Sequence, residues 1–208
     1  MSQSATDYLT ALTDEELITR FQLGDEDAFV ALVRRYKDPL TNYVYRFLGG
    51  FDEANDIVQD TFLRLYQHRH NYQSEGKFAV WLYTIASNIA KSELRRGGRK
   101  YCFSMSGIYG GQGNGEREWD VLDPELGPDA QVDTTFRARL VQKALMQISS
   151  SFREVVILRD IQDMSYEEIA EITGLEMGTV KSRINRGRAQ LQKLLRNVLQ
   201  EDAGRKTT

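Results

Sequence analysis

The sequence predicts an all-α protein made of two small helical domains, and three observations carry this prediction. Apolar residues recur three and four positions apart along most of the chain, as one face of a helix requires. No stretch of useful length alternates apolar and polar residues, as a half-buried strand would. A glycine-rich stretch, Gly97–Gly127, separates two helical segments, so we expect a flexible, acidic linker between separately folded bodies.

In the N-terminal segment, helix ends and apolar stripes predict the first two helices. Thr13-x-x-Glu16 is a capping-box pattern, in which each residue satisfies a backbone donor near the other. After Gly24 a long apolar stripe predicts a second helix. Pro39 should kink or break this helix, and Gly49-Gly50 should end it.

Two further helices are predicted before the glycine-rich stretch. Asp52 can cap the first of them, whose apolar positions run from Ala54 to Leu65. The second lies around Val80–Arg96 and buries an apolar stripe. We therefore place the first domain at residues 1–100 and the linker at residues 101–127.

The helical pattern returns at Pro128, a residue suited to the first position of a helix. Apolar residues from Val132 to Ile148 form its stripe, and Ser151-x-x-Glu154 offers a capping box for the next helix. We place the second domain at residues 128–201 and expect a disordered tail at 202–208.

A helix-turn-helix is predicted near the C-terminal end. Ser165-x-x-Glu168 caps a short helix, Gly174 allows a left-handed turn, and a second helix begins near Gly178. The second helix has one apolar and one basic side, and such a helix fits the DNA major groove, where side chains read bases or hold phosphates. An ordinary helical hairpin with a solvated basic face is the alternative. The candidate DNA-binding residues are Tyr166, Glu167, Ala170, Gly174, Thr179, Lys181, Ser182, Arg183, Asn185, Arg186 and Arg188.

Composition excludes several classes of protein. The chain has 208 residues, of which 41% are hydrophobic and 27% charged, as in globular rather than disordered proteins. The single cysteine, Cys102, excludes an intramolecular disulfide and an all-cysteine zinc site, and two histidines do not repair that deficit. No apolar run approaches the roughly 20 residues of a membrane-spanning helix, and residues 1–12 do not resemble a secretory signal. We therefore expect a cytoplasmic protein without membrane insertion, cofactor or metal.

The net charge of −3 conceals two basic zones. Residues 61–100 carry eight basic and two acidic side chains, a net of +6, and residues 128–208 carry a net of +2. Residues 1–60 and 101–127 carry −7 and −4. Met177–Gln200 holds six basic residues and no acid. A solvated helix face explains one such cluster, but two clusters beside apolar helical patterns favour contact with a polyanion.

Three motifs resemble one known family. Ser165–Arg188, SYEEIAEITGLEMGTVKSRINRGR, resembles the C-terminal DNA-reading region of bacterial sigma-70 family factors, and more narrowly of their extracytoplasmic-function (ECF) group. Gly24–Phe29 is similar to that group's opening helix, and Asp56–Phe62 to its polymerase-binding segment. Phe78–Asn88, followed by Leu94-Arg95-Arg96, resembles the part that melts and reads the −10 promoter element. The resemblance covers about residues 13–100 and 128–198 in the family's order.

The resemblance implies that one surface docks on the clamp helices of the polymerase β′ subunit. The residues assigned to this contact are Asp56, Ile57, Gln59, Asp60, Phe62 and Leu63. The alternative is the preference of a helix N-terminus for acidic side chains, which explains Asp56 but neither Gln59 nor Asp60.

It also implies that the loop at residues 71–77 captures a base flipped from the non-template strand. Flipping costs a few kcal/mol, which new contacts, including aromatic ones, must offset. Phe78 could equally belong to the core, and Trp81 shares a stripe with Ile85 and Ile89, which favours the core. The residues assigned to −10 DNA are Asn71, Tyr72, Lys77, Phe78, Trp81, Tyr83, Asn88, Lys91, Arg95 and Arg96.

By the same resemblance, the helix-turn-helix reads the −35 element, about two helical turns upstream of the −10 region. The implied partners are core RNA polymerase, through the β′ clamp helices and the β flap, promoter DNA, and an anti-sigma factor that clamps between the domains. The chain would carry out no catalysis. It has Ile148-Ser149 where the group usually has Leu-Pro, and the serines there can supply capping instead.

Two other functions are open to the sequence alone. A conventional transcriptional regulator would use residues 1–100 for sensing or dimerisation, but it would not need the basic segment Lys91–Lys100. An enzyme is disfavoured because there is no phosphate-binding glycine loop, and His68 and His70 fit a solvated helix end better than a ligand pair. Cys102 could be a redox-sensing thiol, although a spare exposed cysteine is the simpler interpretation.

Overall fold

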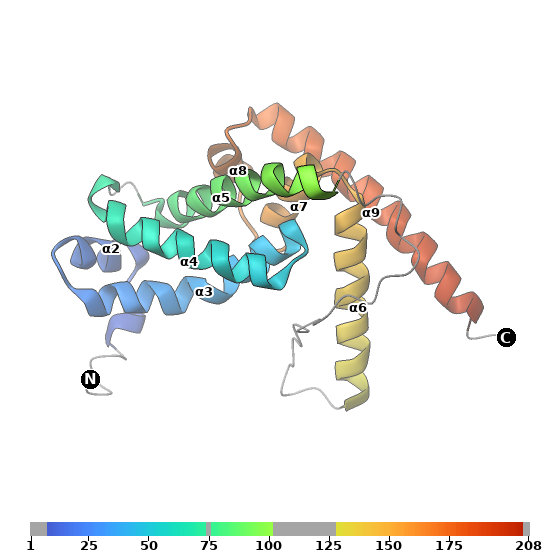
Figure 1. Cartoon of the computed structure of the whole chain (residues 1–208), viewed down its shortest axis with the longest axis horizontal. Coiled ribbons are helices and arrows are strands. Elements are labelled where there is room, and N and C mark those ends of the chain that lie inside the picture. Colours follow the sequence, from blue (N-terminus) through green and yellow to red (C-terminus); the bar gives the residue numbers. More distant parts are fainter. Residues whose placement is uncertain (1–7, 74–75, 102–127, 206–208) are drawn as a thin grey trace.

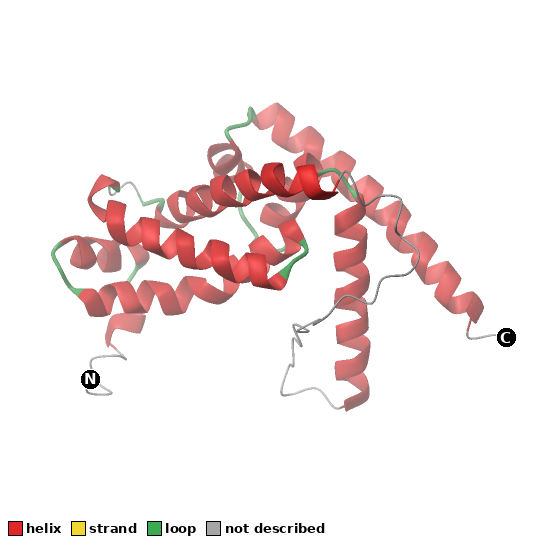
Figure 2. Ribbon diagram, in the orientation of Figure 1, coloured by secondary structure: helices red, strands yellow, loops and turns green. Residues whose placement is uncertain are grey.

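The computed structural model describes residues 8–73, 76–101 and 128–205, and the regular elements in these ranges are helices (Figures 1 and 2). The all-α prediction is confirmed. After a short helical stretch at residues 8–11, the elements are α2 (Asp14–Gln22), α3 (Glu26–Leu48), α4 (Phe51–His68), the 3-10 turn η1 (Arg69–Asn71), α5 (Phe78–Tyr101), α6 (Pro128–Gln147), α7 (Ser150–Asp160), α8 (Tyr166–Thr173) and α9 (Met177–Arg205).

Within those ranges, none of the helices combines the length and the apolar character needed to cross a membrane.

Capping boxes begin α2 and α8, as the sequence predicts. The Glu16 N–H donates to Thr13 Oγ1 at 3.3 Å, and the Thr13 N–H donates to the Glu16 carboxylate at 2.7 Å. Ser165 and Glu168 make the same reciprocal bonds at 3.2 and 2.7 Å. The backbone bond to Thr13 lowers the pKa of the Glu16 carboxyl, because it stabilises the charged form.

Two glycines end helices in the left-handed conformation. Gly49 closes α3 with φ 91°, and Gly174 closes α8 with φ 70°. A side chain at either position would strain the backbone, so both glycines fulfil the roles predicted for them.

One prediction about the N-terminal helices is wrong, and one of the two outcomes expected at Pro39, a break, does not occur. α3 continues through Pro39 without a break. Pro39 has no N–H, so the helix loses one backbone hydrogen bond there. Because Pro39 is exposed, water can reach this side of the helix and bind the carbonyl that is left without its donor. α4 begins at Phe51 after Gly50, which makes no side-chain cap bond, and Asp52 lies in the first turn instead of capping it.

Other helix ends also differ from expectation. α7 follows Ser149 without a side-chain cap bond, and Glu154 binds residues of the N-terminal half instead of closing a capping box. α5 extends through the glycine pair to Tyr101, so the interruption begins later than Gly97. α9 reaches Arg205, within the segment predicted to be a disordered tail.

Helices α2–α5 form an N-terminal bundle in which α3 packs against α2, α4 and α5. An ion pair between Asp14 of α2 and Arg35 of α3, at 2.5 Å, ties two of its helices together. Large, fully buried side chains fill the core, including Leu17, Ile18, Phe21, Leu32, Leu40, Tyr43, Phe47, Leu65, Phe78 and Leu82.

Helices α6–α9 form the C-terminal part, in which α9 packs against α6, α7 and α8. Gly187 of α9 is buried where that helix crosses α7. Because glycine has no side chain, the two helices can approach each other closely at this point. Val155, Ile157 and Leu158 of α7 are buried within this part of the core.

The two halves pack directly against each other. α3 and α5 contact α6, α7 and α8, and the buried apolar residues of both halves form one cluster. α8 packs against α5 and α7 against α3, while in Figure 1 most of α6 and α9 extends away from the N-terminal bundle. The sequence predicts the two helical bodies but gives no indication of this contact.

Replacing Gly187 with alanine tests the close crossing of α7 and α9. An added Cβ would lie 2.7 Å from Val156 Cγ2, whereas at Gly178, also in α9, nothing lies within 4 Å. Both replacements raise helix propensity. We therefore expect Gly187→Ala to have a free energy of unfolding about 1–3 kcal/mol below that of Gly178→Ala, measured by urea denaturation with circular dichroism. Equal stability of the two variants would contradict the crossing.

Candidate nucleic-acid and polymerase interfaces

The helix-turn-helix is formed by α8, Gly174 and the start of α9. The Gly174 and Leu175 N–H groups both donate to the Ala170 carbonyl, at 2.9 and 3.2 Å, and so turn the chain after α8. The buried sides of the two helices carry Ile169, Ile172, Val180 and Ile184. The opposite side of α9 is therefore turned toward solvent.

The exposed face of α9 brings most of the predicted DNA-binding side chains together. The exposed residues are Lys181, Ser182, Asn185, Arg186 and Arg188; Thr179 and Arg183 are half-buried. On α8, Glu167 is exposed, whereas Tyr166 and Ala170 are half-buried. This arrangement presents a basic, hydrogen-bonding helix surface of the kind that fits a major groove.

Two basic residues of α9 are already held by neighbouring side chains. Arg188 binds both carboxylate oxygens of Asp160, with Nε at 3.0 Å from Oδ2. This hydrogen bond raises the pKa of Arg188, because it favours the charged form. Lys181 Nζ lies 5.9 Å from the centre of the Tyr166 ring. Arg186 makes no ion pair with any residue in the described ranges.

The residues assigned to polymerase docking divide into a surface group and a core group. Asp56, Gln59, Asp60 and Leu63 are exposed on α4, whereas Ile57 and Phe62 are only 4% and 8% exposed. Leu63 is 54% exposed, and Tyr66 one turn further is 37% exposed. An apolar patch beside carboxylates is typical of a protein–protein contact.

An aromatic cluster forms the start of α5. The ring of Tyr72 lies 5.8 Å from that of Phe78 and 5.1 Å from that of Trp81, measured between centroids. Tyr72 and Phe78 are buried, at 7% and 1% exposure, while Trp81 is half-buried. In this structure Phe78 therefore lies in the core, and its role as a base contact stays a prediction. Asn71 is exposed in η1.

Glu15 of α2 organises this cluster, and the sequence analysis missed it. Its carboxylate accepts hydrogen bonds from the Tyr72 hydroxyl at 2.6 Å and from the Phe78 N–H at 3.0 Å. The Lys77 N–H in turn donates to the Tyr72 hydroxyl at 3.2 Å. Glu15 thus binds a free backbone donor at the start of α5, where a helix favours negative charge.

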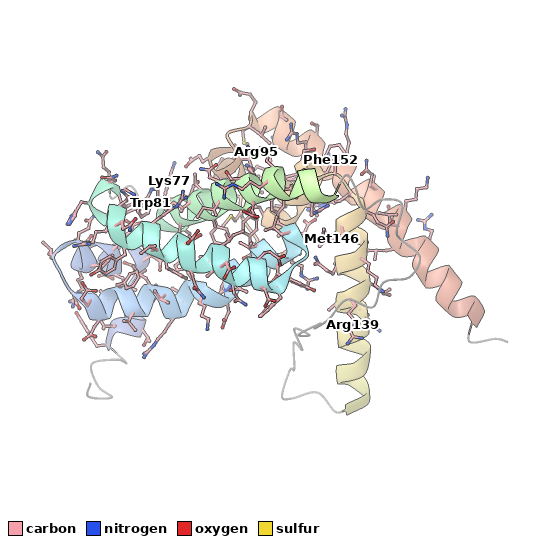
Figure 3. All side chains as sticks on the ribbon, viewed as in Figure 1. Lys77, Trp81, Arg95, Arg139, Met146 and Phe152 are labelled. Atoms are coloured by element: carbon pink, nitrogen blue, oxygen red, sulfur yellow. The ribbon has the colours of Figure 1, made fainter. Side chains whose placement is uncertain are left out.

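The other predicted −10 residues lie along α5 or just before it; Figure 3 labels Trp81 and Arg95 on the helix and Lys77 immediately before it. Asn88, Arg95 and Arg96 are exposed, and Lys91 is half-buried. Tyr83 is buried, with 3% exposure, and this burial raises the pKa of its hydroxyl.

Three of these predicted DNA-binding residues are bound by the C-terminal half. Lys77 Nζ lies 2.5 Å from Glu171 Oε1, and Lys91 Nζ lies 2.8 Å from Glu154 Oε1. Between them in sequence, the Tyr83 hydroxyl donates to Gln162 Oε1 at 2.6 Å. The α5 surface and the α7–α8 region therefore cover each other.

Two adjacent charged residues of α7 lie at the centre of this contact. The Glu154 side chain is 7% exposed, and besides Lys91 it accepts hydrogen bonds from Ser87 at 2.6 Å and Tyr43 at 3.5 Å. Burial raises the pKa of Tyr43, and the negative charge of Glu154 adds to this effect. Arg153 donates to four carbonyl oxygens, those of Leu145, Met146, Ile148 and, across the contact, Phe47.

The sequence holds one signal for this buried contact. Arg153–Leu158 is a run of six buried residues in α7, so the helix is enclosed on every side. A carboxylate in such a helix needs partners from another element. The capping-box spacing of Ser151 and Glu154 offered a local explanation and concealed this need.

The described ranges contain no cluster of potential metal ligands. No group of three or more potential ligands there could hold a metal ion, and His68 and His70 are exposed. Cys102 and the rest of the predicted linker, residues 102–127, lie outside the described residues.

Comparisons with known proteins agree with this architecture. The sequence model of Sigma-70 region 2 matches residues 32–100, and that of Sigma-70 region 4 matches residues 138–191. The chain is 35% identical over 181 residues to the ECF RNA polymerase sigma factor SigW of Bacillus subtilis, covering 87% of this chain and 96% of that protein. It is 32% identical over 193 residues to the RNA polymerase sigma-H factor of Pseudomonas aeruginosa, covering 93% and 99%.

Solved structures support the same fold. The sigma factor RpoE of Bartonella quintana, in complex with the anti-sigma factor NepR, superimposes with a TM-score of 0.62 at 27% identity, covering 81% of this chain and 96% of that one. CnrH, in complex with the cytosolic domain of CnrY, gives a TM-score of 0.64 at 24% identity, covering 88% and 97%.

The two matched regions define a sigma factor, a protein that directs promoter-specific initiation of transcription. With relatives of this similarity, the chain belongs to the ECF group of the sigma-70 family.

The pairing of Arg188 predicts unequal roles for two arginines of α9. Arg188 is already neutralised by Asp160, whereas Arg186 has no ion-pair partner in the described ranges. We expect Arg186→Ala to weaken binding to double-stranded promoter DNA and to lower the salt dependence by about one phosphate contact. Arg188→Ala should change both quantities less. Fluorescence anisotropy over a salt series measures them, and a larger effect at Arg188 would contradict this reading of α9.

Proposed function

We propose that the two domains divide promoter recognition between them. Residues 1–100 bind core RNA polymerase and open and read the −10 element, residues 128–201 read the −35 element, and residues 101–127 join the two. The observation that supports this division is that the candidate DNA-binding surfaces belong to different domains, α5 in one and α9 in the other. Linking two weak DNA-reading modules raises the effective concentration of the second once the first is bound.

The −35 role rests on the exposed face of α9. Ser182 and Asn185 can donate to and accept from base edges, while Lys181 and Arg186 can hold phosphates. α8 would lie across the backbone, as the first helix of this motif does in other helix-turn-helix proteins.

The polymerase contact would be made by the surface group of α4: Asp56, Gln59, Asp60 and Leu63. Carboxylates around an exposed apolar side chain combine electrostatic steering with a desolvated centre. Ile57 and Phe62 support this surface from the core. The β′ clamp helices are the partner that we infer for it, and the β flap is the partner for the C-terminal domain.

The −10 role rests on α5 and its aromatic start. Tyr72 and Trp81, held by the carboxylate of Glu15, lie beside the loop where a flipped base would enter. Further along the helix, Asn88, Lys91, Arg95 and Arg96 would follow the phosphates of the opened strand. Lys77 would contact the same strand at the start of the helix.

In this role the chain carries out no catalysis, because binding energy alone selects and opens the promoter while the polymerase performs the chemistry. A sigma factor of this kind works in the cytoplasm, with the polymerase and the DNA. An anti-sigma factor is a further partner that we propose, supported by the complex of the similar RpoE with NepR.

Transcription with core polymerase tests the whole proposal. The chain is mixed with core enzyme and genomic DNA fragments, and the transcripts are sequenced from their 5′ ends. We expect a small set of start sites that share −10 and −35 motifs. DNA binding by the isolated chain as a dimer, without any such transcripts, would instead indicate a conventional regulator.

Reversing the charge of Asp60 tests the polymerase contact. We expect Asp60→Arg to weaken binding to core polymerase about tenfold or more, because the new cation replaces a carboxylate at the centre of the docking surface. Asp38→Arg is the matched control, since Asp38 is an exposed acidic residue of α3 outside this surface. Titration of fluorescently labelled chain with core enzyme gives both affinities. If the two variants bind equally well, the assignment of α4 is wrong.

A further inference from the structure

We propose that α2 is a positioning element for −10 recognition, in which Glu15 and Gln22 hold Tyr72 and the start of α5 in the arrangement that receives an unpaired base. The inference rests on the proposed function, because it uses the −10 role of Tyr72 and Trp81. None of the predicted DNA contacts lies on α2. In this role Glu15 and Gln22 do not touch the base, and they act on it through Tyr72.

The two positioning residues lie on one face of α2. Glu15 and Gln22 are seven residues apart, which is close to two helical turns, or about 10 Å along the axis. Both are half-buried, and α2 contacts η1 and α5 as well as α3. The helix is anchored by its apolar side chains, since Leu17, Ile18 and Phe21 are fully buried. Burial of α2 therefore does not require the polar bonds that Glu15 and Gln22 make.

Glu15 fixes the Tyr72 side chain to the first residue of α5. Its Oε1 and Oε2 atoms lie 2.6 and 2.8 Å from the Tyr72 hydroxyl, and Oε1 also accepts from the Phe78 N–H at 3.0 Å. The same hydroxyl accepts from the Lys77 N–H at 3.2 Å. Tyr72 is 7% exposed, so loss of Glu15 would take the acceptor from a largely buried hydroxyl.

Gln22 holds the backbone of the same tyrosine. Its side-chain amide has two N–H donors, and Nε2 binds the carbonyls of Arg69 at 2.7 Å and Tyr72 at 2.9 Å. The Arg69 guanidinium also lies over the ring of Phe21 in α2, 5.1 Å from its centroid. Tyr72 is therefore fixed by α2 at both its hydroxyl and its carbonyl.

Tyr72 in turn supports the solvent-facing side of the aromatic cluster. Trp81, labelled in Figure 3, is half-buried, and its ring centroid lies 5.1 Å from that of Tyr72. On the core side, Phe78 contacts both Tyr72 and Tyr36, and the Tyr36 hydroxyl donates to Asp14, the first residue of α2. Of the rings of Tyr72, Phe78 and Trp81, that of Trp81 has the most surface left for a base.

Holding these rings in advance favours base capture. Flipping a base costs stacking and pairing energy, which stacking on an aromatic ring must offset. Side chains that become ordered only on binding would subtract their lost entropy from that gain. A platform fixed by α2 before the DNA arrives does not incur this loss.

Alanine at Glu15 and at Gln22 tests the positioning role. Asp38→Ala and Gln67→Ala are the matched controls, since Asp38 and Gln67 are exposed residues of α3 and α4. Glu15→Gln is the conservative variant, because its amide oxygen can still accept from the Tyr72 hydroxyl.

The first measurement is DNA binding by the holoenzyme formed with core polymerase. The probe is a labelled single-stranded oligonucleotide that carries the −10 motif found by the transcription experiment, and anisotropy gives the affinity. We expect both alanine variants to bind it about tenfold more weakly than wild type, and Glu15→Gln within about threefold, while the controls bind as wild type does. Affinity for core polymerase should be unchanged in all of them, which a general loss of folding would not allow.

A series of oligonucleotides with one abasic site each tests whether α2 acts through a captured base. In wild type, one abasic position should cost the most affinity. The same abasic site should cost Glu15→Ala much less, because the base and the residue that positions its platform act as one unit.

The second measurement is the fluorescence of Trp81 in the free, full-length chain. Replacing Trp119 with phenylalanine leaves Trp81 as the one tryptophan of the sequence. We expect acrylamide to quench Trp81 more strongly in both alanine variants than in the two controls, because Tyr72 no longer holds its ring.

Three results would overturn the inference: equal oligonucleotide affinity in the alanine variants and the controls, an equal abasic cost in wild type and Glu15→Ala, or a parallel loss of core binding, which would make α2 a support of the whole bundle. If Glu15→Ala does not fold, Gln22→Ala, which releases only two backbone carbonyls, is compared in the same way. Failure of the proposed function is distinct, since wild type would then yield no start sites and no −10 motif. Quenching of Trp81 needs no promoter, and unchanged quenching would still overturn the positioning by α2.

Discussion

The buried pair of charges on α7 is the constraint on which the arrangement of the molecule depends. Arg153 and Glu154 are neighbours in sequence, and both are largely buried, at 6% and 5% exposure. Arg153 binds carbonyls at the end of α6 and one at the end of α3, so it joins its own domain to the other. Among the described residues, the partners of the Glu154 carboxylate lie on α3 and α5. Buried charges are tolerated only with such partners, so the position of α7 determines how the two bundles meet.

One helix surface, that of α5, contacts the C-terminal half in this structure, and the proposed function assigns promoter DNA to it as well. Promoter DNA would bind it through phosphates and unstacked bases, and the −35 domain binds it through carboxylates and an amide oxygen. Both partners are acceptor-rich, so Lys77, just before α5, and Tyr83 and Lys91 within it suit either.

Local features of the fold were predictable from sequence, whereas long-range ones were not. The capping boxes at Thr13 and Ser165 and the turn at Gly174 were found because each acts within a few residues. Ser151 and Glu154 have the same spacing but no such bond, because the carboxylate finds better partners 67 residues away at Ser87. Pro39 does not break α3, because packing of the helix on its neighbours outweighs one lost backbone bond. The exposed site residues on α4 and α9 followed from helical periodicity, but their partners in the other domain could not.

The carboxylate of Glu15 shows that the N-terminal folding unit extends beyond the residues matched by the Sigma-70 region 2 model. The family match begins at residue 32, after the whole of α2, yet Glu15 on that helix binds Tyr72 and the first N–H of α5. A domain trimmed to the matched residues would leave a buried hydroxyl and a helix N-terminus without their acceptor. An element that shapes the start of α5 thus lies outside the segment matched by the region 2 model. In this family, domain boundaries drawn by similarity and boundaries drawn by hydrogen bonding need not coincide.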